Sequence, residues 1–200
     1  MPGEPSSGRA LVFFASGDGG WAGLVKRVAK DLAGKGYPVV GLNSLSYLWH
    51  SKDPDRAARD LERTLRHYLD AWKKSEIVLV GYSSGADILP FMATRLPDDL
   101  RARVRLVVLV GPGEQAAFEF HFRDWFGMTP KGVQYPILPE IQRLSGKMVV
   151  CVSGAEEDGG LCPTLPTQLA TVVTLPGGHH VDGDYDRLAE IVIENLPAEK

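Results

Sequence analysis

The 200-residue sequence predicts a single domain with a three-layer α/β fold, in which a parallel sheet lies between two layers of helices. Short and almost continuously apolar runs recur along the chain, as expected for strands that are buried on both faces of a sheet. Segments with apolar residues at helical spacing separate these runs. The composition, 44% hydrophobic and 24% charged, is that of an ordinary globular protein.

Six apolar runs are predicted to form the strands of the sheet. The clearest examples are ALVFFA near the start of the chain and VRLVVLV in its middle. The six predicted strands span residues 10–15, 39–42, 76–80, 104–110, 147–152 and 171–175.

Four amphipathic segments are predicted to be the main helices. The first spans residues 21–35, and Gly36 is placed to cap its carboxyl end. The second begins at Asp53-Pro54, an N-cap followed by proline at the first helical position, and its apolar stripe reaches Trp72. A third helix follows residue 84, and the fourth spans residues 184–196.

The connection over residues 113–146 interrupts this alternation. It is long for a compact domain, and long connections often form lids or binding loops. Its aromatic cluster predicts either an apolar wall beside Ser83 that engages lipid, or a helical excursion that completes the core. The clustered apolar side chains are Phe118, Phe120, Phe122, Trp125, Phe126 and Met128.

Charge and hydropathy exclude several classes of protein. The net charge is −3 and no long run has one sign, so a nucleic-acid partner is not expected. No apolar stretch approaches the roughly 20 residues of a membrane span. The first ten residues lack the apolar core of a signal peptide, so any export signal is expected outside this sequence.

Ser83 is the predicted nucleophile. It stands at the centre of Gly81-Tyr82-Ser83-Ser84-Gly85, a G-x-S-x-G pattern that directly follows a predicted strand and directly precedes a predicted helix. This setting is typical of the nucleophile elbow of α/β-hydrolases. Because the elbow needs a central strand and crossovers are right-handed, we expect the spatial strand order 2-1-3-4-5-6.

His179 is the predicted base, and His180 is its alternative. In the elbow fold the triad follows the chain order serine, acid, histidine, and these two histidines follow the last predicted strand. His179 is preferred because it directly follows two glycines. The other three histidines precede Ser83 or lie in the long connection.

The acid of the triad is expected in the loop after the fifth strand, which reads GAEED. Glu157 is the first candidate and Asp158 the second, while Glu114 after the fourth strand is a weaker third. A carboxylate there would hold the imidazole in the right tautomer and stabilise its charged form. A solvated acidic loop without this role is the structural alternative.

Backbone N–H groups are expected to form an oxyanion hole. One donor is Ser84, which directly follows the nucleophile, and the other lies in the glycine-rich loop around Asp18 and Gly19. The same loop lacks the lysine and the spacing of a P-loop, so it is not expected to cradle phosphates. No metal and no cofactor are expected.

Cys151 and Cys162 bracket the acidic loop. We expect them to form a disulfide that holds this loop in place; two free buried thiols are the alternative. Their spacing is not that of a zinc site.

Three motifs in order give a family resemblance: SGDGGW, GYSSGADILPF and LPGGHHVDGDYD. Together with GAEEDGGLCP they resemble the VirJ/AcvB family of bacterial virulence proteins over about residues 11–196. The resemblance implies an α/β-hydrolase fold, a periplasmic location and an esterase-like activity on aminoacylated phosphatidylglycerol, such as its lysyl ester. Carried over, Ser83, the Glu157/Asp158 pair and the His179/His180 pair would be the working residues.

The expected function is therefore that of a serine ester hydrolase linked to virulence and secretion. Its expected partners are an ester or aminoacyl-lipid substrate, the membrane surface and proteins of a secretion system. The alternatives are a non-catalytic binding or adaptor protein that keeps the fold, because folds do not fix functions, and an acyltransferase that uses the same triad.

Overall fold

The computed structural model describes residues 8–119, 133–144 and 146–196. Its centre is a sheet of six parallel strands in the order β2-β1-β3-β4-β7-β8. These strands are β1 (Ala10–Ala15), β2 (Val39–Leu42), β3 (Glu76–Tyr82), β4 (Val104–Val110), β7 (Met148–Gly154) and β8 (Thr171–Leu175). Since β7 and β8 are the fifth and sixth strands of this sheet, the predicted order is confirmed.

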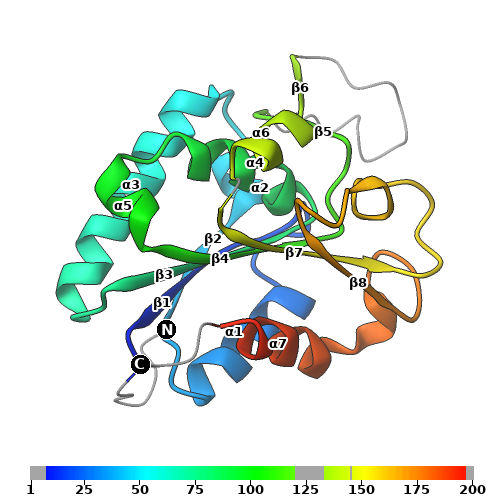
Figure 1. The fold of residues 1–200 in the computed structure, drawn as a ribbon, viewed down its shortest axis with the longest axis horizontal. Helices are drawn as coiled ribbons and strands as arrows, with labels where there is room; N and C mark the ends of the chain where they lie inside the picture. The colour runs from blue at the N-terminus through cyan, green and yellow to red at the C-terminus, as the bar shows by residue number, and fades with distance from the viewer. Residues whose placement is uncertain (1–7, 120–132, 145, 197–200) are drawn as a thin grey trace.

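Helices cover both faces of the sheet and complete three layers (Figure 1). One face is covered by α1 (Gly23–Gly34) and α7 (Tyr185–Glu194), which pack against each other. The other face carries α3 (Pro54–Ala71), α4 (Ser84–Thr94), α5 (Asp98–Arg103) and α6 (Leu138–Arg143). A short helix, α2 (Ser44–Tyr47), follows β2.

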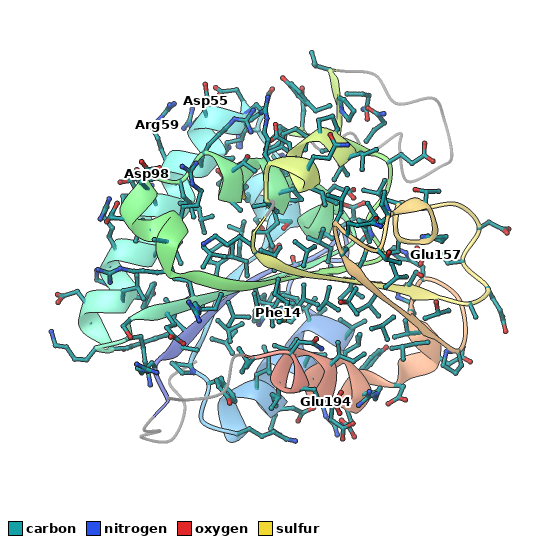
Figure 2. All side chains as sticks on the ribbon, in the orientation of Figure 1. Phe14, Asp55, Arg59, Asp98, Glu157 and Glu194 are labelled. Atoms are coloured by element: carbon teal, nitrogen blue, oxygen red, sulfur yellow. A yellow bond between two sulfur atoms is a disulfide. The ribbon has the colours of Figure 1, made fainter. Side chains whose placement is uncertain are left out.

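Alternation along β1 explains why the sheet is buried on both sides. Leu11 and Phe13 point into the core beneath α3 and α4, whereas Val12 and Phe14 point toward α1 and α7. Phe14 accordingly lies in the middle of the molecule (Figure 2). Burying one such side chain contributes about 1.5–3 kcal/mol to stability, so apolar residues on both faces of a strand stabilise its place in the sheet.

The helix ends follow the predicted capping residues. The Asp53 carboxylate accepts a hydrogen bond from the Arg56 N–H at 2.7 Å, at the start of α3. Gly36 has φ +90° and follows the end of α1. The predicted start of α1 at Trp21 is wrong: the helix begins at Gly23, and the Trp21 ring packs on Gly41, where a Cβ would lie 2.3 Å from it.

The long connection contains a small antiparallel hairpin, β5 (Gln115–Ala117) with β6 (Gln134–Pro136), and α6. Phe118 is 2% exposed and packs edge-to-face on Phe91 and Tyr135, so this ring belongs to the core and not to an exposed wall. The other members of the predicted wall, residues 120–128, lie outside the described residues.

A buried carboxylate fastens α6 to α4. Glu140 is 4% exposed, accepts a hydrogen bond from the Thr94 hydroxyl, and forms ion pairs with Arg95 and Arg143 at 3.1 and 2.9 Å. Because a buried charge is tolerated only when it is paired and hydrogen-bonded, this network fixes the second half of the long connection over the sheet.

The strand β8 forms one edge of the sheet. Among the described strands it pairs with β7 alone, and four of its five residues are exposed or half-buried, with Val172 37% exposed. No helix in the described part of the chain is long and apolar enough to cross a membrane.

Candidate active site

Ser83 occupies a strained turn between β3 and α4. Its φ of 53° and ψ of −126° lie outside the regions that non-glycine residues ordinarily adopt. The flanking glycines are required because a Cβ on Gly85 would lie 2.4 Å from the Ala15 carbonyl oxygen, and one on Gly81 would lie 2.7 Å from the Ala86 Cα. This backbone has the geometry expected of a nucleophile elbow, and it lies at the carboxyl end of a central strand.

His179 and Glu157 come together beside this turn. His179 lies in the loop after β8, and its Nδ1 is hydrogen-bonded to Oε1 of Glu157. The other carboxylate oxygen of Glu157 accepts a hydrogen bond from the Gly154 N–H at 3.3 Å. The Glu157 side chain is 12% exposed, so the carboxylate acts on the imidazole with little screening by water.

Gly111, at the end of β4, makes room for this pair. It has φ +57°, and a Cβ there would lie 2.7 Å from Cε1 of His179 and 3.3 Å from Oε1 of Glu157. The site therefore draws on four neighbouring strand ends: β3 carries Ser83, β4 leaves the space, and the loops after β7 and β8 carry the acid and the imidazole (Figure 1). Figure 2 shows Glu157 in the loop after β7.

The alternative candidates lie elsewhere. His180 is exposed, and its Nδ1 lies 2.7 Å from the Tyr82 hydroxyl rather than beside a carboxylate. Asp158 and Glu114 are exposed. Among the contacts of the described residues, neither carboxylate bonds to a histidine. The geometry thus favours Glu157 with His179.

The glycine-rich loop after β1 faces Ser83. A Cβ on Gly17 would lie 2.9 Å from the Ser83 Cβ, so this loop presses directly against the elbow. The Gly20 N–H donates to the Gly17 carbonyl at 2.9 Å, which leaves Asp18 and Gly19 at the tip of a tight turn. Ser84 is the first residue of α4, where N–H groups have no partner within the helix and the helix dipole favours negative charge.

These residues border one cleft of about 570 Å³. Ser83, His179 and the turn at Asp18 all line it, whereas Glu157 stands behind His179. The cleft is lined by Gly17, Asp18, Gly19, Gly20, Ala22, Gly23, Leu24, Val25, Tyr82, Ser83, His179, His180 and Tyr185. A serine in a strained turn, an imidazole with its carboxylate and backbone N–H groups around one space are the kinds of group that acyl transfer requires.

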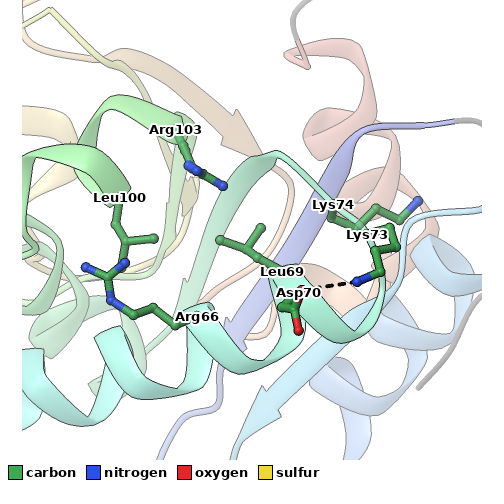
Figure 3. A pocket seen from close by; sticks show the side chains of 7 residues that line it. All are labelled: Arg66, Leu69, Asp70, Lys73, Lys74, Leu100 and Arg103. Atoms are coloured by element: carbon green, nitrogen blue, oxygen red, sulfur yellow. Dashed lines mark hydrogen bonds and ion pairs between the residues drawn. The ribbon is translucent and has the colours of Figure 1, made fainter.

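A second hollow of about 480 Å³ lies between α3 and α5 (Figure 3). The helices α3 and α5 precede β3 and β4, so this hollow lies near the amino ends of these strands. Ser83 lies at the opposite, carboxyl end of β3. It is basic, with Arg66, Lys73, Lys74 and Arg103 among its lining residues. No candidate catalytic residue lies there, and among the described residues no group of three or more His, Cys, Asp or Glu side chains could hold a metal ion.

Two polar groups next to Ser83 were not predicted from the sequence. The Tyr82 hydroxyl contacts His180, and burial, followed by the charges of Tyr185, Glu157 and Asp18, raises the pKa of Tyr82 to about 12. Asp87, one helical turn after Ser83, accepts a hydrogen bond from the Gly113 N–H at 2.8 Å. Burial, and secondly the charge of Asp18, raises the pKa of Asp87 to about 8. In the sequence, the spacing of four residues between Ser83 and Asp87 on a predicted helix was the signal that could have pointed to Asp87.

The predicted disulfide is confirmed. Cys151 in β7 and Cys162 at the start of the 3₁₀ helix η2 (Cys162–Thr164) are bonded, with their Cα atoms 5.4 Å apart. Both residues are fully buried. The bond closes the loop that carries Glu157 onto the strand from which it departs, so it restrains the acid of the candidate triad.

Comparisons with known proteins agree with the fold. A family model described as bacterial virulence protein (VirJ) matches residues 9–200. No curated protein matches the chain. Among solved structures, MenH from S. aureus has a TM-score of 0.68 at 13% identity, covering 98% of this chain and 96% of that one.

Two further solved structures are similar. Est1E from Butyrivibrio proteoclasticus has a TM-score of 0.61 at 15% identity, covering 98% of this chain and 91% of its own. An alpha-beta serine hydrolase homologue from Coxiella burnetii has a TM-score of 0.65 at 17% identity, covering 98% and 89%. At these identities the likeness shows the α/β-hydrolase fold.

Proposed function

The chain belongs to the VirJ family of bacterial virulence proteins, and on that premise we propose that it is a serine hydrolase that cleaves esters. The observation that carries the proposal is the meeting of a serine in a strained elbow with a carboxylate-bonded imidazole at one cleft. An incidental serine in a glycine-rich turn would require neither the unfavourable φ of Ser83 nor the paired His179 and Glu157.

In the proposed reaction Ser83 Oγ attacks the ester carbonyl carbon. His179 takes the hydroxyl proton on Nε2 and then delivers it to the leaving alcohol. Glu157 holds Nδ1 of the same ring as a donor and stabilises the imidazolium that forms. Water, activated by His179, then attacks the acyl-serine ester, releases the acid and restores the free hydroxyl.

The oxyanion of each tetrahedral intermediate is proposed to bind two backbone N–H groups. The N–H of Ser84 opens helix α4 beside the nucleophile. The second donor is assigned to the turn at Asp18 and Gly19, which Gly17 brings against Ser83. Donors of this kind typically contribute about 10²–10³ in rate each.

The substrate and the compartment are finer parts of the proposal. The family resemblance supports an aminoacyl ester of phosphatidylglycerol as substrate, with contact to the membrane surface and a link to secretion. A buried disulfide supports a periplasmic location, because disulfides persist in oxidising compartments.

The test of the activity is labelling by a fluorophosphonate probe together with turnover of a short-chain ester. The wild type should be labelled at one serine, and Ser83→Ala should lose both labelling and turnover while keeping its circular dichroism spectrum. An unlabelled, folded and inactive wild type would instead indicate a binding or adaptor protein. Labelling that persists in Ser83→Ala would place the nucleophile elsewhere.

A further inference from the structure

The side chain of Asp18 stands beside the candidate oxyanion site. The tight turn from Gly17 to Gly20 puts this residue at its tip, and Gly17 presses the turn against Ser83. The Asp18 side chain is exposed and lines the same cleft as the nucleophile. Asp18 therefore directly follows Gly17, the residue that packs against the elbow.

This carboxylate sets the charge of the cleft. Among the described residues that line the cleft, Asp18 is the sole Asp, Glu, Lys or Arg. The contacts described for the chain give its carboxylate neither an ion pair nor a hydrogen bond. The hollow between α3 and α5 is the reverse: it is basic, and the one acid among its lining residues, Asp70, is paired with Lys73 at 3.1 Å (Figure 3).

The charge of Asp18 reaches groups on both sides of the nucleophile. It contributes to the raised pKa of Tyr82, after burial and the charges of Tyr185 and Glu157, and to that of Asp87, after burial. Tyr82 directly precedes Ser83, and Asp87 follows it by one helical turn. The reacting carbonyl would thus be bound within this negative field.

A negative field at this position has an unfavourable effect on ester hydrolysis. Attack by Ser83 places a negative charge on the carbonyl oxygen, and an unpaired carboxylate nearby repels it. A substrate that carries a cation close to the carbonyl cancels the repulsion and gains an ion pair. Neutral and anionic acyl groups have no such compensation, so the same residue attracts one class and disfavours the others.

We propose that Asp18 is a specificity-determining residue that selects acyl groups with an ammonium group next to the ester carbonyl, as in α-aminoacyl esters. The inference rests on the proposed hydrolase function and adds to it the residue that chooses the acyl group. Tyr82 and Tyr185 line the same cleft and bring no opposite charge to it.

The test compares two esters of the same shape, alanine methyl ester and methyl isobutyrate, at a pH where the amine is protonated. After division by the hydroxide-catalysed rates, the wild type should prefer the alanine ester by at least tenfold in kcat/KM. Asp18→Asn should lose at least tenfold of this preference, because kcat/KM for the alanine ester should fall by at least tenfold more than kcat/KM for the isobutyrate. Asp70→Asn, which removes the same charge from the hollow between α3 and α5, should keep the wild-type ratio.

An equal loss on both esters in Asp18→Asn, or an unchanged ratio, would overturn the inference while leaving the hydrolase proposal intact. Binding separates the two further. Ser83→Ala should bind alanine amide more tightly than isobutyramide in calorimetry, and Ser83→Ala/Asp18→Asn should not discriminate. This comparison decides the role of Asp18 even when no ester is turned over; equal binding of both amides to Ser83→Ala would refute it.

Discussion

His179 and Glu157 lie 22 residues apart in the chain, yet the imidazole Nδ1 of one is hydrogen-bonded to the carboxylate Oε1 of the other. The bond joins the loop after β7 to the loop after β8, two adjacent strands of the sheet. This hydrogen bond therefore forms only when β7 and β8 are paired in the sheet, because neither loop contains both partners.

Glu157→Gln should lower kcat by about 10⁴-fold, because an amide cannot stabilise the imidazolium and favours the wrong tautomer. Asp158→Asn removes a neighbouring exposed carboxylate and should change kcat less than threefold. Steady-state kinetics on a short-chain ester measures both. Comparable losses in the two variants would mean that the acidic loop acts through its overall charge.

His180→Asn and Tyr82→Phe should each lower kcat/KM by about 2–10-fold, the effect of one hydrogen bond of about 0.5–1.5 kcal/mol. The double variant should lose no more than either single one, since both remove the same contact. His179→Asn should lose several orders of magnitude. If His180→Asn were the more damaging variant, the assignment of the base would be reversed.

Gly111→Ala should disable the site, because its Cβ would lie 2.7 Å from the imidazole and 3.3 Å from the Glu157 carboxylate. Gly146→Ala is the matched control: Gly146 has φ +85° and open space around it. Both variants should lose about 1–2 kcal/mol in the free energy of unfolding, the cost of a left-handed backbone for alanine. Only Gly111→Ala should lose activity, and equal activity in the two would show that the pair can shift without cost.

Removing the disulfide with Cys151→Ala/Cys162→Ala should lower the free energy of unfolding by about 2–3 kcal/mol, as expected for closure of a short loop. Activity should also fall at temperatures where the variant remains folded, because the loop that carries Glu157 loses its anchor. Urea unfolding and kinetics on the same sample check this. Full activity in a destabilised variant would limit the bond to a purely stabilising role.

Asp87 predicts a pH dependence of stability. Its pKa of about 8 in the folded protein exceeds the unfolded value of 3.8, so between these values the folded state holds a proton that the unfolded state has lost. Its contribution to stability is therefore lost as pH rises from about 4 to 8. Asp87→Asn, which keeps an oxygen acceptor for Gly113, should remove this slope and be about 1–3 kcal/mol more stable than wild type at pH 9. Parallel urea-unfolding profiles of the two proteins against pH would contradict the assignment.

The central sheet was predictable because its strands are nearly continuous apolar runs with glycine-rich turns at their carboxyl ends. The elements that were not predicted are short. The strands β5 and β6 have three residues each, and α2, α5 and α6 have four to six, too few to display a hydrophobic period.

The candidate site was predictable as a set of loops but not to the single residue. His179 and His180 are adjacent, so their separation depends on how the loop turns, and Val181 and Asp182 both have positive φ just beyond them. Likewise, Glu157 contacts an imidazole that belongs to another loop, and no local sequence pattern encodes which two loops meet.

The position of β8 at the sheet edge has a consequence for how the protein would lose activity on warming. Edge elements with few buried side chains open more readily than the core, in local fluctuations that leave the rest of the domain folded. His179 belongs to the loop that follows this strand, whereas Ser83 follows the central β3. Detachment of β8 would carry the imidazole away from an intact nucleophile elbow, so inactivation on warming would be an early and reversible event that precedes cooperative unfolding.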